Sequence, residues 1–471
     1  MQEILFEYNV TPTTWAYLSA LLILGIYFKF RRFWSVRNLD LLGLISFTPG
    51  LLLIFHGLTK PNATNLVTLG YWWLLVAGVL FVFRLFLDSM MVRRPLLEPN
   101  LNASGLTFTG AALLVFLAAN VIANKPPERL EHKLPGPKSS ALLNPGMPQF
   151  QYLATFVAYA TEQSKQPDPK APNAKPASSK QTPPAAVAPT AAGTELRWTY
   201  PPEAAQRTTS RLIVLGSLAA LMAGMVLVGY RHFDNIETGV AAAALYLLLP
   251  YSGQMTSRID HVLCGALLVW MVAAYRRPVL AGMLGGVTSG LIFYPLFLLP
   301  LWSSFYWRRG WKRFLGGFAL ALGVMVALAA LLPGCPLSLA DRMRQLFGFT
   351  QMFGRAGAVG EMSVGLWQAM DVTYRIPVMA VFAALTLSLM IWPAQKNLGT
   401  LLSCTAAVML GSQFWHLYEG GLYMAWYLPL LVLTIFRPNL EDRVASSAVI
   451  EGRGTWPGRL IERLRRKRAA A

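Results

Sequence analysis

The chain has 471 residues, of which 55% are hydrophobic and only 13% are charged, and its mean hydropathy is +0.44. Soluble domains carry roughly 25% charged residues, and one soluble core cannot hide this much apolar surface, so an ordinary soluble protein is excluded. The formal net charge of +19 would suit a nucleic-acid partner. Its basic residues, however, form short clusters beside apolar segments, a pattern typical of the cytoplasmic edge of a membrane protein. We therefore expect membrane lipids, and no nucleic acid, as partners.

About 11 segments are apolar enough to predict membrane-spanning helices, each of which needs about 20 mostly apolar residues. They lie near residues 13–29, 40–58, 69–87, 106–123, 211–230, 237–250, 261–275, 314–332, 376–392, 398–415 and 421–436. The predicted fold class is all-α, a polytopic transmembrane helical bundle. We divide the chain into N-terminal transmembrane helices at 1–105, a main transmembrane domain at 106–437 and a basic tail at 438–471.

The segment 278–307 is too long for one untilted span and too short for two. Basic residues flank it on both sides, at Arg276/Arg277 and at Arg308/Arg309. Several glycines weaken its first half as a helix, and Pro295 and Pro300 interrupt the second half. We predict a broken helical hairpin that enters the membrane and returns to the same face. One long crossing followed by an interfacial stretch is the alternative.

With the hairpin in place, one orientation puts the short basic loops on a single side, which the positive-inside rule assigns to the cytoplasm. The loops placed inside are 30–39, 88–105, 231–236, 276–277, 308–313 and 393–397, together with the C-terminal tail. The predicted location is the cell membrane, with the N-terminus extracytoplasmic and the C-terminus cytoplasmic.

The long loop at 124–209 then lies outside. Its residues 165–192 consist mainly of Pro, Ala and Lys, which cannot form a core and predict a disordered linker. The stretch 141–163 is either an amphipathic helix on the membrane or a plain loop. The basic tail is either a surface helix on anionic headgroups or a simple cytoplasmic anchor.

Two outer segments carry the residues that suggest chemistry. The first contains Gln254, Arg258, Asp260 and His261 within eight residues, at the mouth of a predicted helix. An arginine beside an aspartate can bind a phosphate and accept a proton from a hydroxyl. The alternative is a purely structural role, in which a local Arg–Asp pair caps the helix. If Asp260 is a base near the interface, its loss should reduce activity and cost little stability.

The second segment is the last outer turn, where His416, Glu419 and Tyr423 meet the aromatic side chains of Trp415, Trp426 and Tyr427. Flat rings stack on sugars and carboxylates bind hydroxyls, which predicts a sugar-binding rim; an aromatic belt at the membrane interface is the alternative. The charges of the outer segment 333–375, Arg375 included, are typical of a solvated loop. Three cysteines without a CxxC pair imply no metal site.

The run SGQMTSRIDHVLCGALLVWMVAAYRRPVLAGMLGGVTSGLIFYPLFLLPLW, followed by WRRGWKRF, resembles integral-membrane GT-C glycosyltransferases, most closely the polyprenyl-phosphate-mannose-dependent branch. The matching elements are Gly253-Gln254, Arg276-Arg277, Ala281-Gly282 to Gly285, and Tyr294-Pro295-Leu296 to Pro300. The closing GGLYMAWYLPLLVLTIFRP resembles the last helix of that family. The resemblance covers about residues 210–437 and implies a GT-C-like fold.

The resemblance also implies a polyprenyl-phosphate sugar as donor, an extracytoplasmic acceptor and no cofactor. The family's base is an Asp early in the first large outer loop, but this loop begins NKPPERLEHKLPG, so Glu128, Glu131 and Asp260 are the candidates. Tyr294 joins the candidate substrate-binding residues. The lysine that the family commonly carries in its hairpin is absent here.

The predicted function is therefore a membrane glycosyltransferase. Two alternatives remain open, a non-catalytic membrane scaffold and a transporter of lipid or a small solute. An outer groove lined by Gln254, Asp260 and His416 would favour the enzyme, a path through the bundle would favour the transporter, and the absence of both would favour the scaffold.

Overall fold

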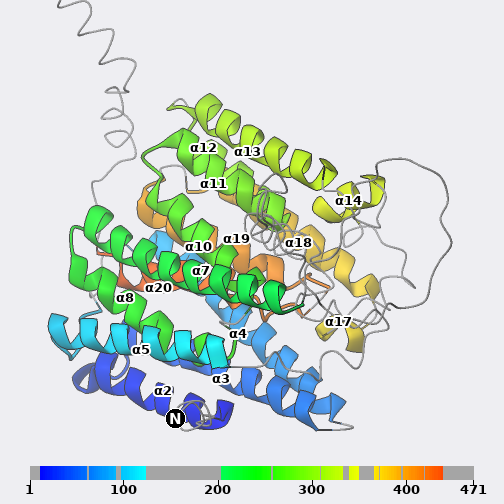
Figure 1. Cartoon of the computed structure of the whole chain (residues 1–471). Helices are drawn as coiled ribbons and strands as arrows, with labels where there is room; N and C mark the ends of the chain where they lie inside the picture. Colours follow the sequence, from blue (N-terminus) through cyan, green and yellow to red (C-terminus); the bar gives the residue numbers. More distant parts are fainter. Residues whose placement is uncertain are drawn as a thin grey trace, which may run out of the picture.

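The structure is a computed structural model that describes most of the predicted helices but not the long loop or the tail. The described residues are 11–60, 63–91, 97–123, 203–255, 258–307, 309–331, 339–349, 365–370, 372–393, 396–417 and 419–438. Within them every regular element is an α-helix or a short 3-10 turn, so the all-α fold class is confirmed (Figure 1). Glu128, Glu131, the segment 141–163, the linker at 165–192 and the tail from 439 onward lie outside the described residues.

The N-terminal part consists of four helices: α2 (Pro12–Tyr27), α3 (Val36–Thr59), α4 (Thr64–Met90) and α5 (Ala103–Ala123). Side-chain caps fix the starts of α2 and α3, where Thr11 and Ser35 accept hydrogen bonds from the first-turn N–H groups. The helices α3 and α4 pack closely, with Gly50 against Leu74. These helices do not stand apart from the rest, because α4 also packs on α19 (Leu398–Gln413).

The next helices are α7 (Glu203–His232), α8 (Ile236–Leu248), α9 (Pro250–Met255) and α10 (Ile259–Ala273). Two hydrogen bonds hold α7 and α10 side by side: Trp270 Nε1 donates to the Ala220 carbonyl at 2.8 Å, and the His232 ring lies 2.8 Å from the Ala273 carbonyl. The later residue of α10, Ala273, contacts the later residue of α7, His232, so the two helices run parallel. This parallel pair places the start of α10, and with it Asp260, at the end of the bundle away from His232.

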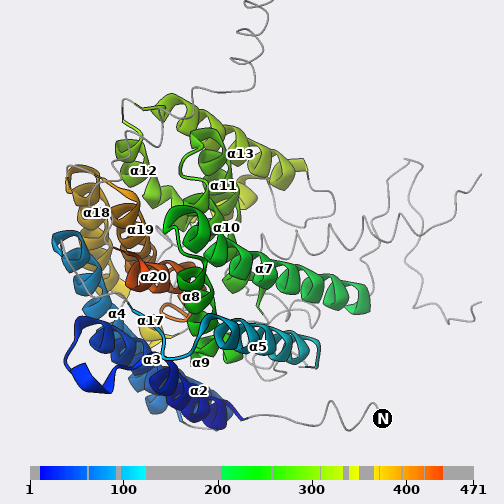
Figure 2. The same ribbon diagram turned by 90° about the vertical axis from the view of Figure 1, so that its left-hand side faces the viewer.

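The last part contains α13 (Trp311–Leu331), α14 (Leu339–Leu346), α17 (Leu366–Ala369), α18 (Arg375–Ile391), α19 and α20 (Leu428–Phe436). Every residue of α19 and of α20 is buried. Figures 1 and 2 show α20 at the centre of the molecule, with α2, α3 and α5 on one side and α11 and α13 on the other. The core is thus built around helices that lie at the C-terminal end of the described chain.

The predicted hairpin is confirmed as a broken pair of short helices. It consists of α11 (Pro278–Leu291), the 3-10 turn η3 (Tyr294–Leu298) and α12 (Leu299–Phe305). The Tyr306 hydroxyl donates to the Tyr275 carbonyl at 2.5 Å, so the end of the hairpin returns to its beginning. A single long crossing is therefore wrong, and both basic flanks lie at the same end of the bundle.

Glycines bring α11 against α13. A Cβ on Gly282 would overlap the carbonyl oxygen of Phe314, and one on Gly286 would overlap that of Phe318. A Cβ on Gly317 would likewise overlap the carbonyl of Val279. The two helices therefore touch backbone to backbone, as small residues allow in membrane proteins.

Five of the described helices, α3, α4, α5, α7 and α13, are long and apolar enough to cross a membrane, judged by length and composition. Of six further apolar helices of 10–17 residues, five lie at predicted spans and the sixth is α11 of the hairpin. The predicted span at 421–436 contains one α-helix, the nine-residue α20, so the count of about 11 spans stays a prediction. Large apolar side chains point outward on several helices; Phe83, Phe108 and Val381 are 64%, 76% and 71% exposed. Such faces suit contact with lipid rather than water.

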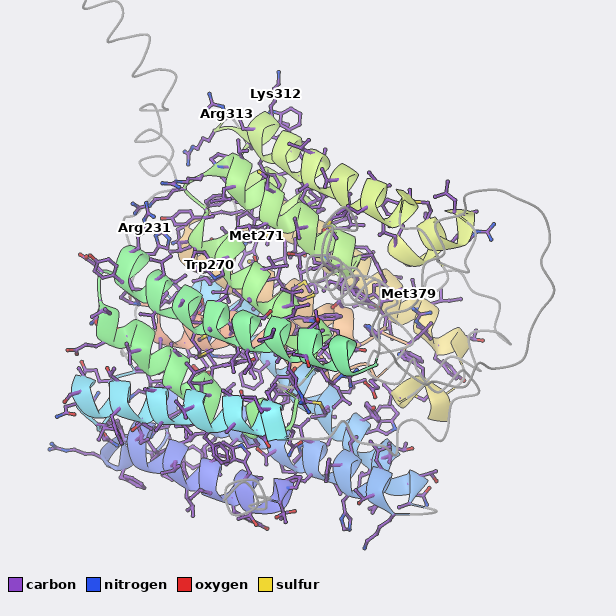
Figure 3. The ribbon with its side chains drawn as sticks, in the orientation of Figure 1. Arg231, Trp270, Met271, Lys312, Arg313 and Met379 are labelled. Carbon is purple, nitrogen blue, oxygen red and sulfur yellow. The ribbon has the colours of Figure 1, made fainter. Side chains whose placement is uncertain are left out.

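One end of the bundle holds a group of four charges, three of them buried and one partly buried, that we call the four-charge network. Its members are Asp40, Arg84, Asp88 and Arg437. Arg84 donates to both carboxylate oxygens of Asp40, at 2.6 and 2.7 Å, and Arg437 donates to Asp88 at 2.7 Å. The basic residues Arg231, Lys312 and Arg313 gather toward one end of the molecule in Figure 3. Which end faces the cytoplasm is a prediction.

Candidate functional site

Three charged side chains from two distant segments meet in one cluster. Arg258 donates to Glu419 at 2.7 Å and to Asp260 at 3.2 Å. The Asp260 and Glu419 side chains are only 7% and 5% exposed, whereas that of Arg258 is 23% exposed. Burial alone would lower the pKa of Arg258, but the two carboxylates outweigh it and hold this pKa well above its usual value. Arg258 is therefore a permanent cation that joins α10 to the turn before α20.

The local backbone fixes both carboxylates. Asp260 lies in the first turn of α10, where a negative charge is favourable, and its carbonyl accepts a hydrogen bond from Trp426 Nε1 at 2.9 Å. Glu419 has a φ of 50°, a left-handed conformation that is uncommon for a residue with a Cβ, and Gly421 follows with a φ of 97°. The strained turn at Glu419 is thus held by its contact with Arg258.

A second polar chain lies directly beside the carboxylates. The Tyr251 hydroxyl accepts a hydrogen bond from the Ala425 N–H at 3.0 Å and lies 2.6 Å from His261 Nδ1. These contacts are satisfied when the hydroxyl donates to Nδ1, which leaves the imidazole proton on Nε2. That nitrogen lies 3.9 Å from the Asp260 carboxylate. The His261 Nε2–H is therefore placed to donate a hydrogen bond to the Asp260 carboxylate after a small movement.

Buried aromatic rings extend the cluster. Ring centroids lie 4.7 Å apart for His261 and Tyr423, 4.7 Å for His416 and Tyr423, and 4.9 Å for Tyr294 and His416. The stack continues to Trp415, 5.1 Å from Tyr294. A continuous aromatic row thus connects the hairpin residue Tyr294 with the charges at the start of α10.

The structure brings together most of the residues that the sequence singled out. These are Arg258, Asp260, His261, Tyr294, His416, Glu419 and Tyr423. Gln254 lies in α9, and both polar atoms of its amide are buried without a hydrogen-bond partner among the described residues. Both the sugar-binding rim and the interfacial belt are wrong for Trp415 and Trp426, which are only 1% and 0% exposed. Asp260 is also more deeply buried than an interfacial pair, so its loss should cost more stability than expected from the sequence.

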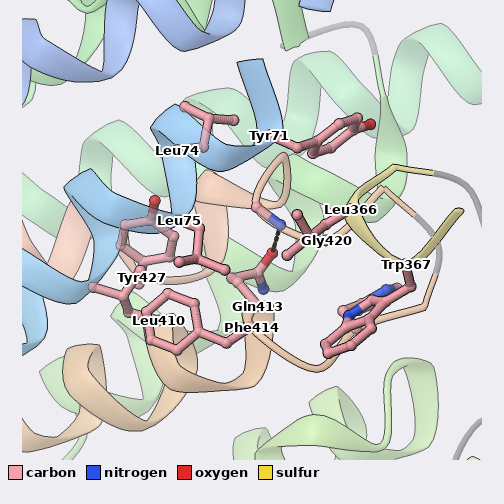
Figure 4. Close-up of a pocket in the computed structure, with 12 residues that line it drawn as sticks. Tyr71, Leu74, Leu75, Leu366, Trp367, Leu410, Gln413, Phe414, Gly420 and Tyr427 are labelled. Carbon is pink, nitrogen blue, oxygen red and sulfur yellow. Dashed lines mark hydrogen bonds between the residues drawn. The ribbon is translucent and has the colours of Figure 1, made fainter. Parts of the chain in front are cut away.

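A pocket lies beside the aromatic row (Figure 4). It is lined by Tyr71, Leu74, Leu75, Leu366, Trp367, Leu410, Gln413, Phe414, His416, Gly420, Gly421 and Tyr427. Its walls are mainly apolar, and its polar groups include His416 and Gln413, whose amide oxygen accepts a hydrogen bond from the Gly421 N–H at 3.2 Å. His416 lines this pocket without Gln254 or Asp260. The pocket is therefore not the groove that we predicted for an enzyme.

Arg375 is a polar residue that sequence reasoning assigned wrongly. We expected it in a solvated loop, but it is the first residue of α18 and is 3% exposed. Its Nε donates to the Trp415 carbonyl at 2.6 Å, and its guanidinium lies 5.4 Å from the Trp415 ring centre. The sequence does contain a signal, because an arginine at the N-terminus of an apolar helix opposes the helix dipole.

In the described part of the chain, no group of three His, Cys, Asp or Glu side chains is arranged to hold a metal ion. Comparisons with known proteins give no match: no protein-family model, no curated protein and no solved structure matches this chain. The GT-C resemblance therefore rests on the residues quoted from positions 210–437.

Proposed function

We propose that the protein is a membrane glycosyltransferase that moves a sugar from a polyprenyl-phosphate donor to an acceptor outside the cytoplasm. One observation supports this best: the two outer segments singled out from the sequence meet where Arg258 holds Asp260 and Glu419. A partly exposed cation between two buried carboxylates, with polar aromatic rings beside it, is suited to an anionic, sugar-bearing substrate.

In the proposed reaction an acceptor hydroxyl attacks the anomeric carbon of the donor. The new carbon–oxygen bond forms as the bond to phosphate breaks, and the lipid phosphate leaves with the bonding electrons. Asp260 takes the hydroxyl proton, while Arg258 offsets the charge that develops on the leaving phosphate. Because Arg258 binds Asp260 at 3.2 Å in the free protein, a phosphate that draws Arg258 away also makes Asp260 a stronger base.

The test is consumption of a polyprenyl-phosphate-linked sugar by the purified protein in liposomes. We expect Asp260→Asn to lower turnover by about 10²–10⁴-fold, the usual loss for a general base. Glu237→Gln is the matched control, because Glu237 is an exposed acid in the first turn of α8 and lies outside the cluster. Full turnover by Asp260→Asn with loss in Glu128→Gln or Glu131→Gln would move the base to the long loop.

A non-catalytic scaffold is the second candidate, and the depth of the same cluster favours it. Asp260 and Glu419 are almost fully buried and clamp α10 to the turn before α20, which is sufficient reason for their presence in a purely structural protein. In that case no lipid-linked sugar is consumed by any variant, and Asp260→Asn changes stability alone. That result would overturn the proposed sugar transfer.

A further inference from the structure

Arg375 lies close to the surface, but its side chain is covered. It is 3% exposed, whereas its chain neighbours Tyr374 and Ile376 are 63% and 67% exposed. The first turn of α18 is therefore accessible from outside the protein, and a ligand that reaches this turn meets a covered guanidinium group.

The contacts of Arg375 do not neutralise its charge. Nε donates to the Trp415 carbonyl at 2.6 Å, and the Trp415 ring faces the guanidinium. Nη2 is buried without a hydrogen-bond partner, and no carboxylate pairs with Arg375 in the part of the chain that the structure describes. Because arginine stays protonated in proteins, this group is a buried positive charge without a counter-ion among the described residues.

The helix end adds a second positive feature at the same place. Tyr374, the N-cap of α18, makes no side-chain capping hydrogen bond to the first turn. The 3-10 turn η4 (Val372–Tyr374) runs directly into α18, so the Arg375 N–H already has an acceptor in that turn, whereas the Ile376 N–H has no acceptor within α18 itself. The helix dipole also carries its positive end here, where it repels a cation and attracts an anion.

We propose that Arg375 and the first turn of α18 bind the phosphate group of a phosphate ester. The planar guanidinium matches the oxygens of a phosphate, the positive end of the helix attracts its charge, and the Trp415 contacts hold the guanidinium plane in place. A lipid headgroup and a soluble phosphate ester share this chemistry. The site goes beyond the proposed sugar transfer, because it requires neither a sugar nor turnover.

The four-charge network shows what this chain does with a buried arginine that serves structure alone. Arg84 and Arg437 each donate to a buried carboxylate at 2.7 Å or less. Among the described residues, Arg375 instead makes its hydrogen bond with the carbonyl of Trp415 and its cation–π contact with the ring of Trp415. If Arg375 served structure alone, an uncharged side chain could replace it without changing ligand binding. If Arg375 binds a ligand, the same replacement weakens that binding.

The experiment measures the melting temperature of the full-length protein in a neutral detergent. The probes are short-chain phosphatidic acid, inorganic phosphate and the matching neutral diacylglycerol, tested on wild type, Arg375→Gln, Arg375→Lys and Arg344→Gln. Arg344 is the matched control, an exposed arginine on α14. A ligand that binds only the folded state raises the melting temperature as its concentration passes Kd.

We expect the phosphate-bearing probe to stabilise wild type and Arg344→Gln equally, with Kd at least about tenfold weaker in Arg375→Gln. Arg375→Lys should keep part of the response, because it retains the charge and loses the planar fork. Stabilisation by phosphatidic acid alone assigns the ligand to a lipid headgroup, and stabilisation by both phosphate probes assigns it to the phosphate group itself.

Three results would overturn the site. They are no response of wild type to either phosphate probe, an equal response in Arg375→Gln, and a response to the neutral diacylglycerol that matches the others. If Arg375→Gln does not fold, Arg375→Lys carries the test, because an unchanged Kd in that variant excludes recognition by the planar guanidinium. None of these results bears on sugar consumption, so the two proposals fail separately.

Discussion

The four-charge network and the cluster around Arg258 are made from the same kinds of side chain but differ in how completely their charges are paired and buried. In the network, Arg84 binds Asp40 with two N–H groups, and Asp88 contacts both Arg84 and Arg437. At the start of α10, Arg258 shares its charge between two carboxylates, and its side chain keeps 23% exposure. Arg375, at the other end of the aromatic row, has no carboxylate partner among the described residues. A network in which every charge is paired needs no role beyond holding helices together, whereas incompletely paired charges suggest that a ligand completes the pairing.

Labelling from outside the cell gives the largest expected effect, because the outcome is all or none. In a background with Cys264, Cys335 and Cys404 replaced by alanine, we expect an impermeant thiol reagent to label Ser178→Cys and not Lys312→Cys. The basic flanks of the hairpin then face the cytoplasm, as the positive-inside rule predicts. Labelling of Lys312→Cys in intact cells would reverse the assignment of the two ends; permeabilised cells provide the control.

Removing one member of the four-charge network should destabilise the protein strongly. Asp88→Asn leaves Arg437 without its carboxylate, and breaking a buried ion pair in this way costs about 3–5 kcal/mol. Equilibrium unfolding in mixed micelles measures the loss, with Glu98→Gln as the exposed control. Adding Arg437→Gln should recover part of the stability. No recovery in the double variant would mean that the pair does not act as a unit.

The cluster around Arg258 should respond less, because each carboxylate can partly replace the other. Asp260→Asn leaves the 2.7 Å contact between Arg258 and Glu419 intact, so we expect a loss of about 1–3 kcal/mol in unfolding free energy. The double variant Asp260→Asn/Glu419→Gln should lose more than the sum of the single variants. Strict additivity in the same unfolding assay would show that the two carboxylates do not share Arg258.

Deleting residues 165–192 should have the smallest effect. Their Pro, Ala and Lys composition offers no apolar group whose burial could offset the entropy of ordering. We expect the unfolding free energy to change by less than about 0.5 kcal/mol, the range of ordinary surface changes. Loss of folded protein on deletion would show that this segment docks onto the bundle.

The helices and the hairpin were predictable because their signals are local. Apolar runs marked the helices, and paired arginines with Gly and Pro between them marked a segment that must turn back. The sequence placed the segments of Asp260 and Glu419 on the same face of the membrane. It did not predict that Arg258 joins them, because that depends on how α10 packs against the turn before α20.

The partners of individual charges were not predictable. Arg84, Asp88 and Arg375 all lie near the ends of apolar segments, where a sequence pattern cannot distinguish a solvated charge from a buried one. The difference depends on which helix packs alongside, and that is a tertiary property. For the same reason the sequence suggested an exposed aromatic rim at Trp415 and Trp426, whereas both rings are buried.

The break in the hairpin also constrains how the chain is made. The 14 residues of α11 rise only about 21 Å, less than the roughly 30 Å of hydrocarbon in a bilayer. The chain then leaves the helix at Ile292 and Phe293, which are buried in protein at 2% and 4% exposure. Backbone groups freed by such a break cannot face lipid. Since α11 rests on α13 and Phe293 packs on Trp415, both of which are synthesised later, we expect the hairpin to complete its packing only after those segments have been made. Assembly of this region is therefore delayed, and a chain that stops before Leu331 should leave the hairpin unassembled.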